Sequence, residues 1–480
     1  MKRFLIFSFI IFYGAMLIDP VIDISFDSPR YITTADSIAS GNGYRAISEI
    51  DNNPVFYNNY IFPYILAPLI RIFGLNPYPL KILILIFSLL SILLFFSLTL
   101  KLFSKKEALL LSISLMSMPI FIRFSNKVLT EAPFMLFLLL SLWLLHRYFQ
   151  KDKKIYLGLL LVTTYFLIFT RTIGSLMLIP LFIYSCTKRD RSLFMMTAIL
   201  AIITILTMHV IQSRTAPENY LYHIKYLLYK DAFTPEQGYI DIGCLIIRAV
   251  NNIKFYFLNI PKETFNLPSF GISLYAALFW TLLCLGMYNI RPNFYKTIFF
   301  VFFTTYISFF IIWPWQNTRF IYPILFIMLI YLYCGFKSLI IGTPSAIKRI
   351  IYLTVIISIL YSGLKELLLE ITVNRIHPAE VNELVQLSSW IKDNLPQEPV
   401  ILSKNTALIY MLSSKKGTYT PYSYDMEKIT AHIEKKGVTH ILADRFNSEM
   451  IKYIYPWINK NKERLKIIKI NGGTVLFELD

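Results

Sequence analysis

The sequence is short of charged residues. They make up 16% of its 480 residues, whereas 56% of the residues are apolar. A soluble protein of this size carries closer to a quarter of charged residues, so the composition excludes an ordinary soluble domain. Long apolar runs recur between short basic clusters, and this pattern predicts a polytopic α-helical membrane protein.

Acidic residues are also few, with 29 Asp and Glu against 47 Lys and Arg. The net charge of +18 could suggest a nucleic-acid partner. Most basic residues, however, lie in short connections between apolar runs, where they orient helices in the membrane. We therefore expect membrane lipids around this chain and no nucleic-acid partner.

Three further absences narrow the class of protein. No pair of the four scattered cysteines has metal-ligand spacing, and a disulfide framework is not expected. The opening stretch "MKRFLIFSFIIFYGAMLID" lacks a small-x-small cleavage site before Asp19, so we interpret it as an uncleaved first transmembrane helix. The C-terminal region has no glycine-rich phosphate loop, which argues against nucleotide binding.

The apolar windows predict about eleven transmembrane helices by the ~20-residue criterion. The windows lie at 4–22, 79–100, 107–122, 131–148, 155–170, 172–187, 193–211, 271–290, 296–313, 319–337 and 350–368. Every second connection is short and basic, which predicts a cytoplasmic N-terminus. The long loops 23–78 and 213–270 and everything after residue 369 then face outward.

The composition changes near residue 370. The remaining chain alternates helical and strand patterns and ends in a hairpin about Asn471-Gly472-Gly473. We therefore expect two domains. Residues 1–369 form a domain in the cell (inner or plasma) membrane, and residues 370–480 form a small extracytoplasmic α/β domain.

The first outer loop contains "SFDSPRYITTADSIASGNGY" (25–44). Pro29 near the start and Gly41 past the end mark a short helix, whose apolar stripe suggests that it lies along the membrane surface. With Ser28 as the cap, Asp27 lies beside the positive end of the helix, which favours an ionised carboxylate. Arg30 is near enough to bind an anion there. Alternatively, Asp27 only helps to cap the helix and Arg30 contacts lipid headgroups.

This stretch resembles the C-type (GT-C) membrane glycosyltransferases, in particular the branch of protein O-mannosyltransferases and lipid A aminoarabinose transferases. That branch has an acidic residue after the first span, then Arg-Tyr and a small-residue helix ending in Gly. The matching residues here are Asp27, Arg30, Tyr31, Ala35, Ala39 and Gly41. "FPYILAPLIRIFG" (62–74) is similar to the stretch that closes the first loop of the branch.

Three later stretches resemble the same branch. "LTEAPFMLFLLLSLWLL" (129–145) places Glu131 at the branch's acidic position, where its fourth span opens. "FTRTIGSLMLIP" (169–180) and "NTRFIYPILF" (317–326) are similar to its Arg-bearing turns, at Arg171 and Arg319.

The resemblance implies a hexosyl- or pentosyltransferase that uses a polyprenyl-phosphate sugar. Such an enzyme transfers the sugar, with inversion, to an acceptor lipid, polysaccharide or protein of the cell envelope. It implies Asp27 as the general base. It implies Arg30, Arg171 and Arg319 at the donor phosphate, with Tyr31 and Glu131 in support. Plainer roles for these residues are snorkelling, interface anchoring and helix-dipole stabilisation.

The chain also departs from the branch. The second half of its first loop lacks a double Pro and a preceding Lys, so phosphate binding through that Lys is not implied. No His/Glu pair marks a metal site in this loop, and a divalent-metal cofactor stays open.

Two alternatives to this enzyme remain. One is a transporter or flippase of lipid-linked sugars, although the internal repeats common in transporters are absent. The other is an oligosaccharide polymerase or ligase, whose large outer loop usually lies late in the chain.

Overall fold

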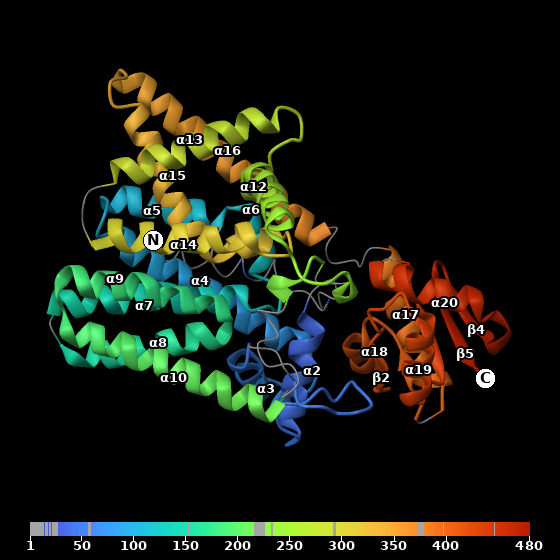
Figure 1. Ribbon diagram of the computed structural model, residues 1–480. Helices are drawn as coiled ribbons and strands as arrows, with labels where there is room; N and C mark the ends of the chain where they lie inside the picture. Colours follow the sequence, from blue (N-terminus) through green and yellow to red (C-terminus); the bar gives the residue numbers. More distant parts are fainter. Residues whose placement is uncertain are drawn as a thin grey trace.

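The structure is a computed structural model of the chain (Figure 1). It describes residues 14, 18, 21, 27–55, 59–151, 153–215, 226–231, 234–290, 294–372, 379–396, 398–445 and 447–480. Apart from three isolated positions, the predicted first span at 4–22 lies outside the described residues.

Six helical segments among the described residues are long and apolar enough to cross a membrane. Four of them are the whole helices α4 (Pro77–Thr99), α7 (Glu131–Lys151), α13 (Ile272–Asn289) and α16 (Ser345–Thr372). The fifth is Arg191–Ile211 within α10 (Arg191–Thr215). The sixth is Thr318–Leu339, which consists of η4 (Thr318–Ile324) and α15 (Leu325–Leu339). The described residues before the C-terminal unit form further helices, of which α12 is long but less apolar. They are α2 (Ser28–Ala39), α3 (Ile61–Phe73), α5 (Lys105–Met116), α6 (Pro119–Phe124), α8 (Lys154–Thr170), η1 (Thr172–Met177), α9 (Leu178–Lys188), η3 (Pro235–Gln237), α12 (Ile242–Phe265) and α14 (Phe294–Ile312).

The predicted fold class, a polytopic helical membrane protein with a small α/β part, is confirmed. Nine of the eleven predicted windows coincide with apolar helices. The window 107–122 is not one span: α5 ends at Met116, and Pro119 starts α6 after a two-residue break. Pro119 has no backbone N–H and restricts the residue before it, which explains the interruption.

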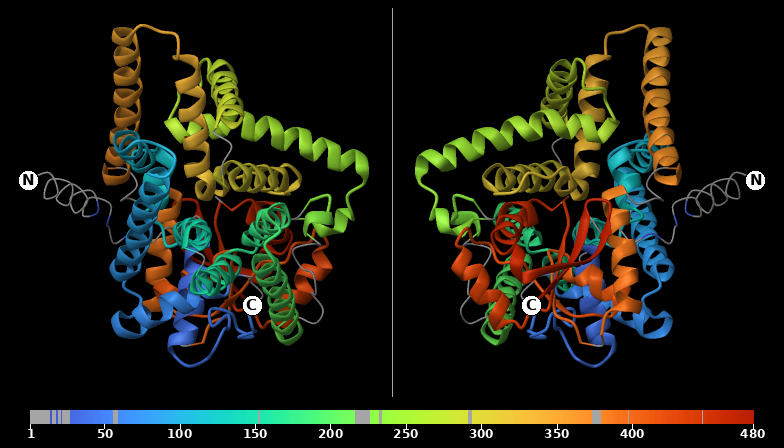
Figure 2. Two further views of the ribbon diagram at one scale, coloured as in Figure 1. Left: turned by 90° about the vertical axis from the view of Figure 1, so that its left-hand side faces the viewer. Right: turned by 90° about the vertical axis from the view of Figure 1, so that its right-hand side faces the viewer.

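The helix bundle has two different ends (Figure 1). The basic connections between α7 and α8, between α9 and α10, and between α15 and α16 lie at the end away from the C-terminal domain. The long helix α12 crosses the bundle near the other end (Figures 1 and 2). Arg171 follows α8 and Arg319 lies in η4, which leads into α15. Both residues therefore lie at the ends of these helices opposite to the basic connections, on the side of the C-terminal domain.

Close packing between α13 and α15 depends on two glycines. A Cβ atom added to Gly286 would lie 1.7 Å from the carbonyl oxygen of Tyr331, and one on Gly335 would lie 1.9 Å from that of Leu282. In lipid, helices associate through such close contacts, because burial of apolar surface gives no advantage between them. The two glycines therefore set the distance between these helices.

The C-terminal residues form a three-layer α/β unit. Its sheet has the order β2-β1-β3-β5-β4, in which β2, β1 and β3 are parallel, β5 is antiparallel to β3, and β4 is antiparallel to β5. Helices α17 and α18 pack on one face of the sheet, and α19, η5 and α20 pack on the other. The strands are β1 (Ile401–Leu402), β2 (Gly417–Thr418), β3 (His440–Ala443), β4 (Leu465–Asn471) and β5 (Thr474–Leu479). The helices are α17 (Ala379–Asn394), α18 (Thr406–Ser413), α19 (Met426–Lys435), η5 (Met450–Ile454), α20 (Tyr455–Lys460) and η6 (Lys462–Arg464).

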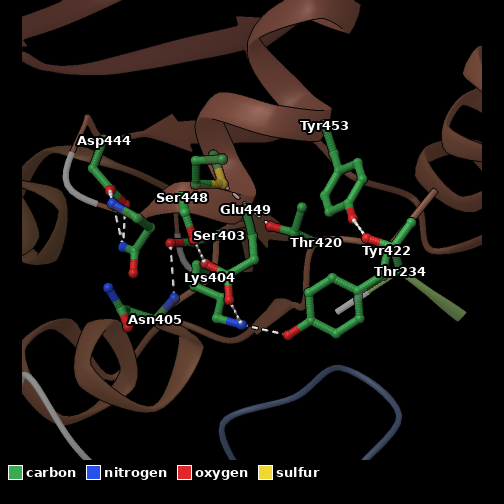
Figure 3. Close-up of polar contacts among 12 residues, drawn as sticks. Thr234, Ser403, Lys404, Asn405, Thr420, Tyr422, Asp444, Ser448, Glu449 and Tyr453 are labelled. Atoms are coloured by element: carbon green, nitrogen blue, oxygen red, sulfur yellow. Dashed lines mark hydrogen bonds and ion pairs between the residues drawn. The ribbon is translucent and has the colours of Figure 1, made fainter. Parts of the chain in front are cut away.

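The second predicted outer loop, residues 213–270, contacts a polar network inside this unit (Figure 3). The hydroxyls of Thr234 and Tyr453 lie 3.1 Å apart. Deeper in the network, Lys404 forms an ion pair of 2.8 Å with Glu449 and also donates to the hydroxyl of Tyr422. The C-terminal unit is thus bonded to this loop through polar side chains.

Candidate functional site

Asp27 precedes helix α2 and is its N-cap residue, but its side chain makes no capping hydrogen bond. The predicted cap, Ser28, is instead the first residue of the helix, so that prediction is wrong. The second helical residue is Pro29, which has no N–H for a cap to accept, and the Asp27 carboxylate turns to another partner. The alternative role of Asp27, that its side chain only caps the helix, is therefore not what the structure shows.

That partner is Arg319, at the start of η4. Its Nη2 donates to Oδ2 of Asp27 over 3.0 Å, and its Nε lies 3.8 Å from Oε1 of Glu131. The same oxygen of Glu131 accepts a hydrogen bond of 2.6 Å from Nη1 of Arg171. Four side chains from α2, α7, the α8–η1 junction and η4 thus form a continuous chain of ion pairs, which we call the ion-pair chain.

The accessibility of the two acids differs. The side chain of Asp27 is 37% exposed, whereas that of Glu131 is 2% exposed. Oε2 of Glu131 is buried and accepts no hydrogen bond from the described residues. Asp27 can therefore contact a substrate, while Glu131 binds the two arginines from the buried side of the site.

An aromatic ring aligns both arginines. The guanidinium carbon of Arg319 lies 5.3 Å from the ring centre of Phe320, and that of Arg171 lies 5.5 Å from it. The hydroxyl of Tyr306 donates to the Phe320 carbonyl over 2.7 Å and so holds this residue in place. Phe320 directly follows Arg319 in "NTRF", but no pattern in the sequence marks Phe320 or Tyr306 as a site residue.

The turn that carries Arg319 is braced from α12. Nδ2 of Asn252 donates to three backbone carbonyls at the end of α14 and just after it, at distances of 2.8 to 3.2 Å. Its Oδ1 accepts from Nε2 of Gln316 over 3.0 Å. Asn252 is buried, and it lies in a stretch for which the sequence predicted no helix.

The remaining predicted site residues, Arg30 and Tyr31, lie on the first turn of α2. The guanidinium of Arg30 lies over the ring of Tyr419 from the C-terminal domain, 5.0 Å from its centre. The Tyr31 hydroxyl accepts a hydrogen bond of 2.6 Å from Asn59, and its ring packs edge-on against Phe62 of α3. Most of α2 is buried between α3 and α18, so it does not leave its apolar stripe open to lipid.

The charges around Asp27 favour its ionised form. Burial raises the pKa of this carboxyl, but the positive charges of Arg319 and Arg30 outweigh burial and lower the pKa below its usual value. Burying so many charges near a membrane costs free energy, and charges in such places usually have a function. The ion-pair chain is therefore a candidate active site.

Among the described residues, no group of three His, Cys, Asp or Glu side chains converges. Asp27 and Glu131, the two acids of the ion-pair chain, are each paired with arginine. These side chains suit an anionic ligand better than a metal ion.

The chain was compared with known proteins by sequence and by structure. Residues 59–212 match the model of the dolichyl-phosphate-mannose-protein mannosyltransferase family. No curated protein sequence matches the chain significantly.

Two solved structures show the fold. The crystal structure of ArnT from Cupriavidus metallidurans bound to undecaprenyl phosphate is similar over 99% of this chain and 98% of that chain, with 12% identity and a TM-score of 0.66. The archaeal oligosaccharyltransferase AglB from Archaeoglobus fulgidus, in complex with an inhibitory peptide and a dolichol-phosphate, is similar over 100% of this chain and 74% of that chain. Its identity is 12% and its TM-score 0.58. The chain therefore has the fold of the C-type membrane glycosyltransferases, as the resemblance in its sequence implied.

Proposed function

We propose that this protein is an inverting glycosyltransferase that takes a sugar from a polyprenyl-phosphate donor. It transfers the sugar to a lipid, polysaccharide or protein acceptor at the outer face of the cell membrane. The observation that carries this proposal is the ion-pair chain, which joins Asp27, Arg319, Glu131 and Arg171 at the bundle end nearest the C-terminal domain. The comparisons support the donor class, because the ArnT structure binds undecaprenyl phosphate and the AglB structure binds a dolichol-phosphate.

Asp27 acts as the general base of the transfer. The acceptor oxygen attacks the anomeric carbon of the sugar from the side opposite the phosphate, and its proton passes to the carboxylate. The bond between the anomeric carbon and the phosphate oxygen breaks, and polyprenyl phosphate leaves with the electron pair. One carboxylate is enough for this single displacement. The lowered pKa of Asp27 keeps it ionised at neutral pH.

The arginines stabilise the leaving phosphate. Arg319 and Arg171 are held by Glu131 and by the ring of Phe320, so their positions are set before a ligand arrives. Preorganised positive groups stabilise charge that develops in the transition state without reorganising during the reaction. Asp27 and a bound phosphate both bind Arg319. The phosphate therefore competes for the guanidinium and releases the carboxylate toward the acceptor.

The test is sugar release from a panel of polyprenyl-phosphate hexoses and pentoses by the purified full-length protein. Replacement Asp27→Asn should reduce turnover about 100- to 10,000-fold, the usual contribution of a general base. Asp36→Asn removes a carboxylate from the same helix outside the ion-pair chain, and it should retain activity.

Two outcomes would overturn the proposal. Unchanged turnover in the Asp27→Asn protein would remove this residue from the reaction. Movement of the lipid-linked sugar across vesicle membranes, without any sugar release by the wild-type protein, would identify a transporter.

A further inference from the structure

The first outer loop extends the sheet of the C-terminal domain. Strand β2 is at one edge of that sheet, and its residue Gly417 donates to the carbonyl of Ser48 over 3.0 Å. The carbonyl of Gly417 accepts from the N–H of Ile50 over 2.9 Å, so the residues around Glu49 run parallel to β2. The loop that contains Asp27 and the C-terminal domain therefore share backbone hydrogen bonds.

Side chains strengthen this junction. Lys436 of the C-terminal domain donates to Asp51 of the loop. Ser48, in the same loop, is buried. Helix α18 packs against α2, the helix that starts after Asp27. The relative position of the domain and the first loop is thus held by several bonds that do not involve the ion-pair chain.

Tyr419, two residues after Gly417, contacts Arg30. The guanidinium of Arg30 lies over the ring of Tyr419, at 5.0 Å from the ring centre. Arg30 is three residues after Asp27, and its charge is among those that lower the pKa of Asp27. Burial raises the pKa of Glu49 at the junction, and Arg30 opposes that rise as well. Arg30 therefore lies between the candidate active site and the junction.

We propose that the C-terminal domain is a working part of the donor site, because its residue Tyr419 positions Arg30 for the donor phosphate. This inference rests on the proposed function. An aromatic face attracts a guanidinium and so restricts where the guanidinium lies.

A role in packing alone does not account for this contact. The junction already has backbone hydrogen bonds at Gly417 and the pair of Lys436 and Asp51. One cation–π contact adds little to such an interface, whereas it limits the orientations of a long and flexible arginine side chain. Tyr419 is therefore a positioning residue that acts through Arg30.

The experiment compares variants of the full-length protein in detergent, with undecaprenyl phosphate as the binding probe. Tyr419→Ala should weaken probe affinity and raise the KM for the sugar donor about 2- to 5-fold, with a smaller change in kcat. Tyr419→Phe keeps the aromatic face and should bind like the wild type. Lys436→Ala weakens the junction away from Arg30 and should also leave probe affinity unchanged. Tyr419→Leu replaces the alanine variant if that protein does not fold.

A double-mutant cycle decides whether Tyr419 acts through Arg30. If it does, Tyr419→Ala has no further effect on affinity in a protein that already carries Arg30→Ala. Equal losses in Tyr419→Ala and Lys436→Ala, or additive losses in the double variant, would overturn the inference. If Arg30→Ala weakens binding but Tyr419→Ala does not, the inference fails while the proposed function stands. If Asp27→Asn retains turnover, it is the proposed function that fails.

Discussion

Asp27 and Arg319 are 292 positions apart in the sequence, yet their side chains share a hydrogen bond of 3.0 Å. The first residue precedes a helix of the first outer loop, and the second starts the segment that becomes α15. This contact joins the first predicted outer loop to the turn before α15. It also links a carboxylate that is partly exposed to a cation that Glu131 holds from the buried side.

The pH dependence of turnover should report this contact. Asp27 is active as a base only when ionised, so kcat/KM falls as the pH falls through its pKa. Arg319 lowers that pKa, and Arg319→Gln should therefore move the acid limb of the profile to higher pH. The profile would be measured on the residual activity of the variant between about pH 4 and pH 8. An acid limb at the same pH in both proteins would contradict the assignment of Asp27 as the base.

Asn252 should affect turnover without touching a substrate. Its amide donates to the carbonyls at the end of α14 and so places the turn that leads to Arg319. We expect Asn252→Ala to reduce kcat about 10- to 100-fold, because small displacements of catalytic groups are costly. Asn252→Asp has nearly the same size but cannot donate, so it should lose as much activity. An active aspartate variant would show that the amide hydrogen bonds do not position the turn.

Gly286 should be essential for the packing of α13 against α15. Gly286→Ala would place a methyl group 1.7 Å from the Tyr331 carbonyl, and we expect a loss of stability of at least about 2 kcal/mol. Gly158→Ala is the matched control in helix α8, where an added Cβ meets nothing within 4 Å. Thermal unfolding in detergent should show a lower Tm for the first variant only. A Tm unchanged in both would mean that the two helices separate at little cost.

Glu449 should stabilise the C-terminal domain in a pH-dependent way. Burial raises the pKa of this carboxyl, but the hydrogen bond and charge of Lys404 outweigh burial, and the pKa is lowered. The contribution is therefore complete above the unfolded pKa, 4.5, and is lost as the pH falls through the folded pKa.

The variant Glu449→Gln leaves Lys404 without its charged partner. It should lose about 3 kcal/mol of stability at neutral pH, and its difference from the wild type should shrink in acid. Tryptophan fluorescence on heating would measure the stability of the domain, since Trp390 and Trp457 lie in it. Glu463→Gln, at an exposed site, is the control. A difference that grows in acid would mean that folding raises the pKa of Glu449 instead of lowering it.

The sequence by itself determined the class of fold. Apolar windows of membrane length, separated by basic connections, have one structural solution in lipid, because each backbone polar group must be bonded within its own helix. The periodicities of the C-terminal stretch likewise predict α17, α19 and the hairpin β4–β5, all of which the structure contains. Such patterns depend on neighbouring residues, so they can be read from the chain without knowing what it packs against.

The resemblance to a family marked Arg171 and Arg319, and local pattern marked Asp27, beside the positive end of a helix. Local pattern misplaced the cap of α2, because whether Asp27 bonds its own helix or a distant arginine depends on where that arginine lies. The roles of Phe320, Asn252 and Tyr419 have no local signature at all.

Only the tertiary structure decided which charges meet. Each ion pair of the site joins separate helices, and its energy depends steeply on distance and burial, which no run of neighbouring residues specifies.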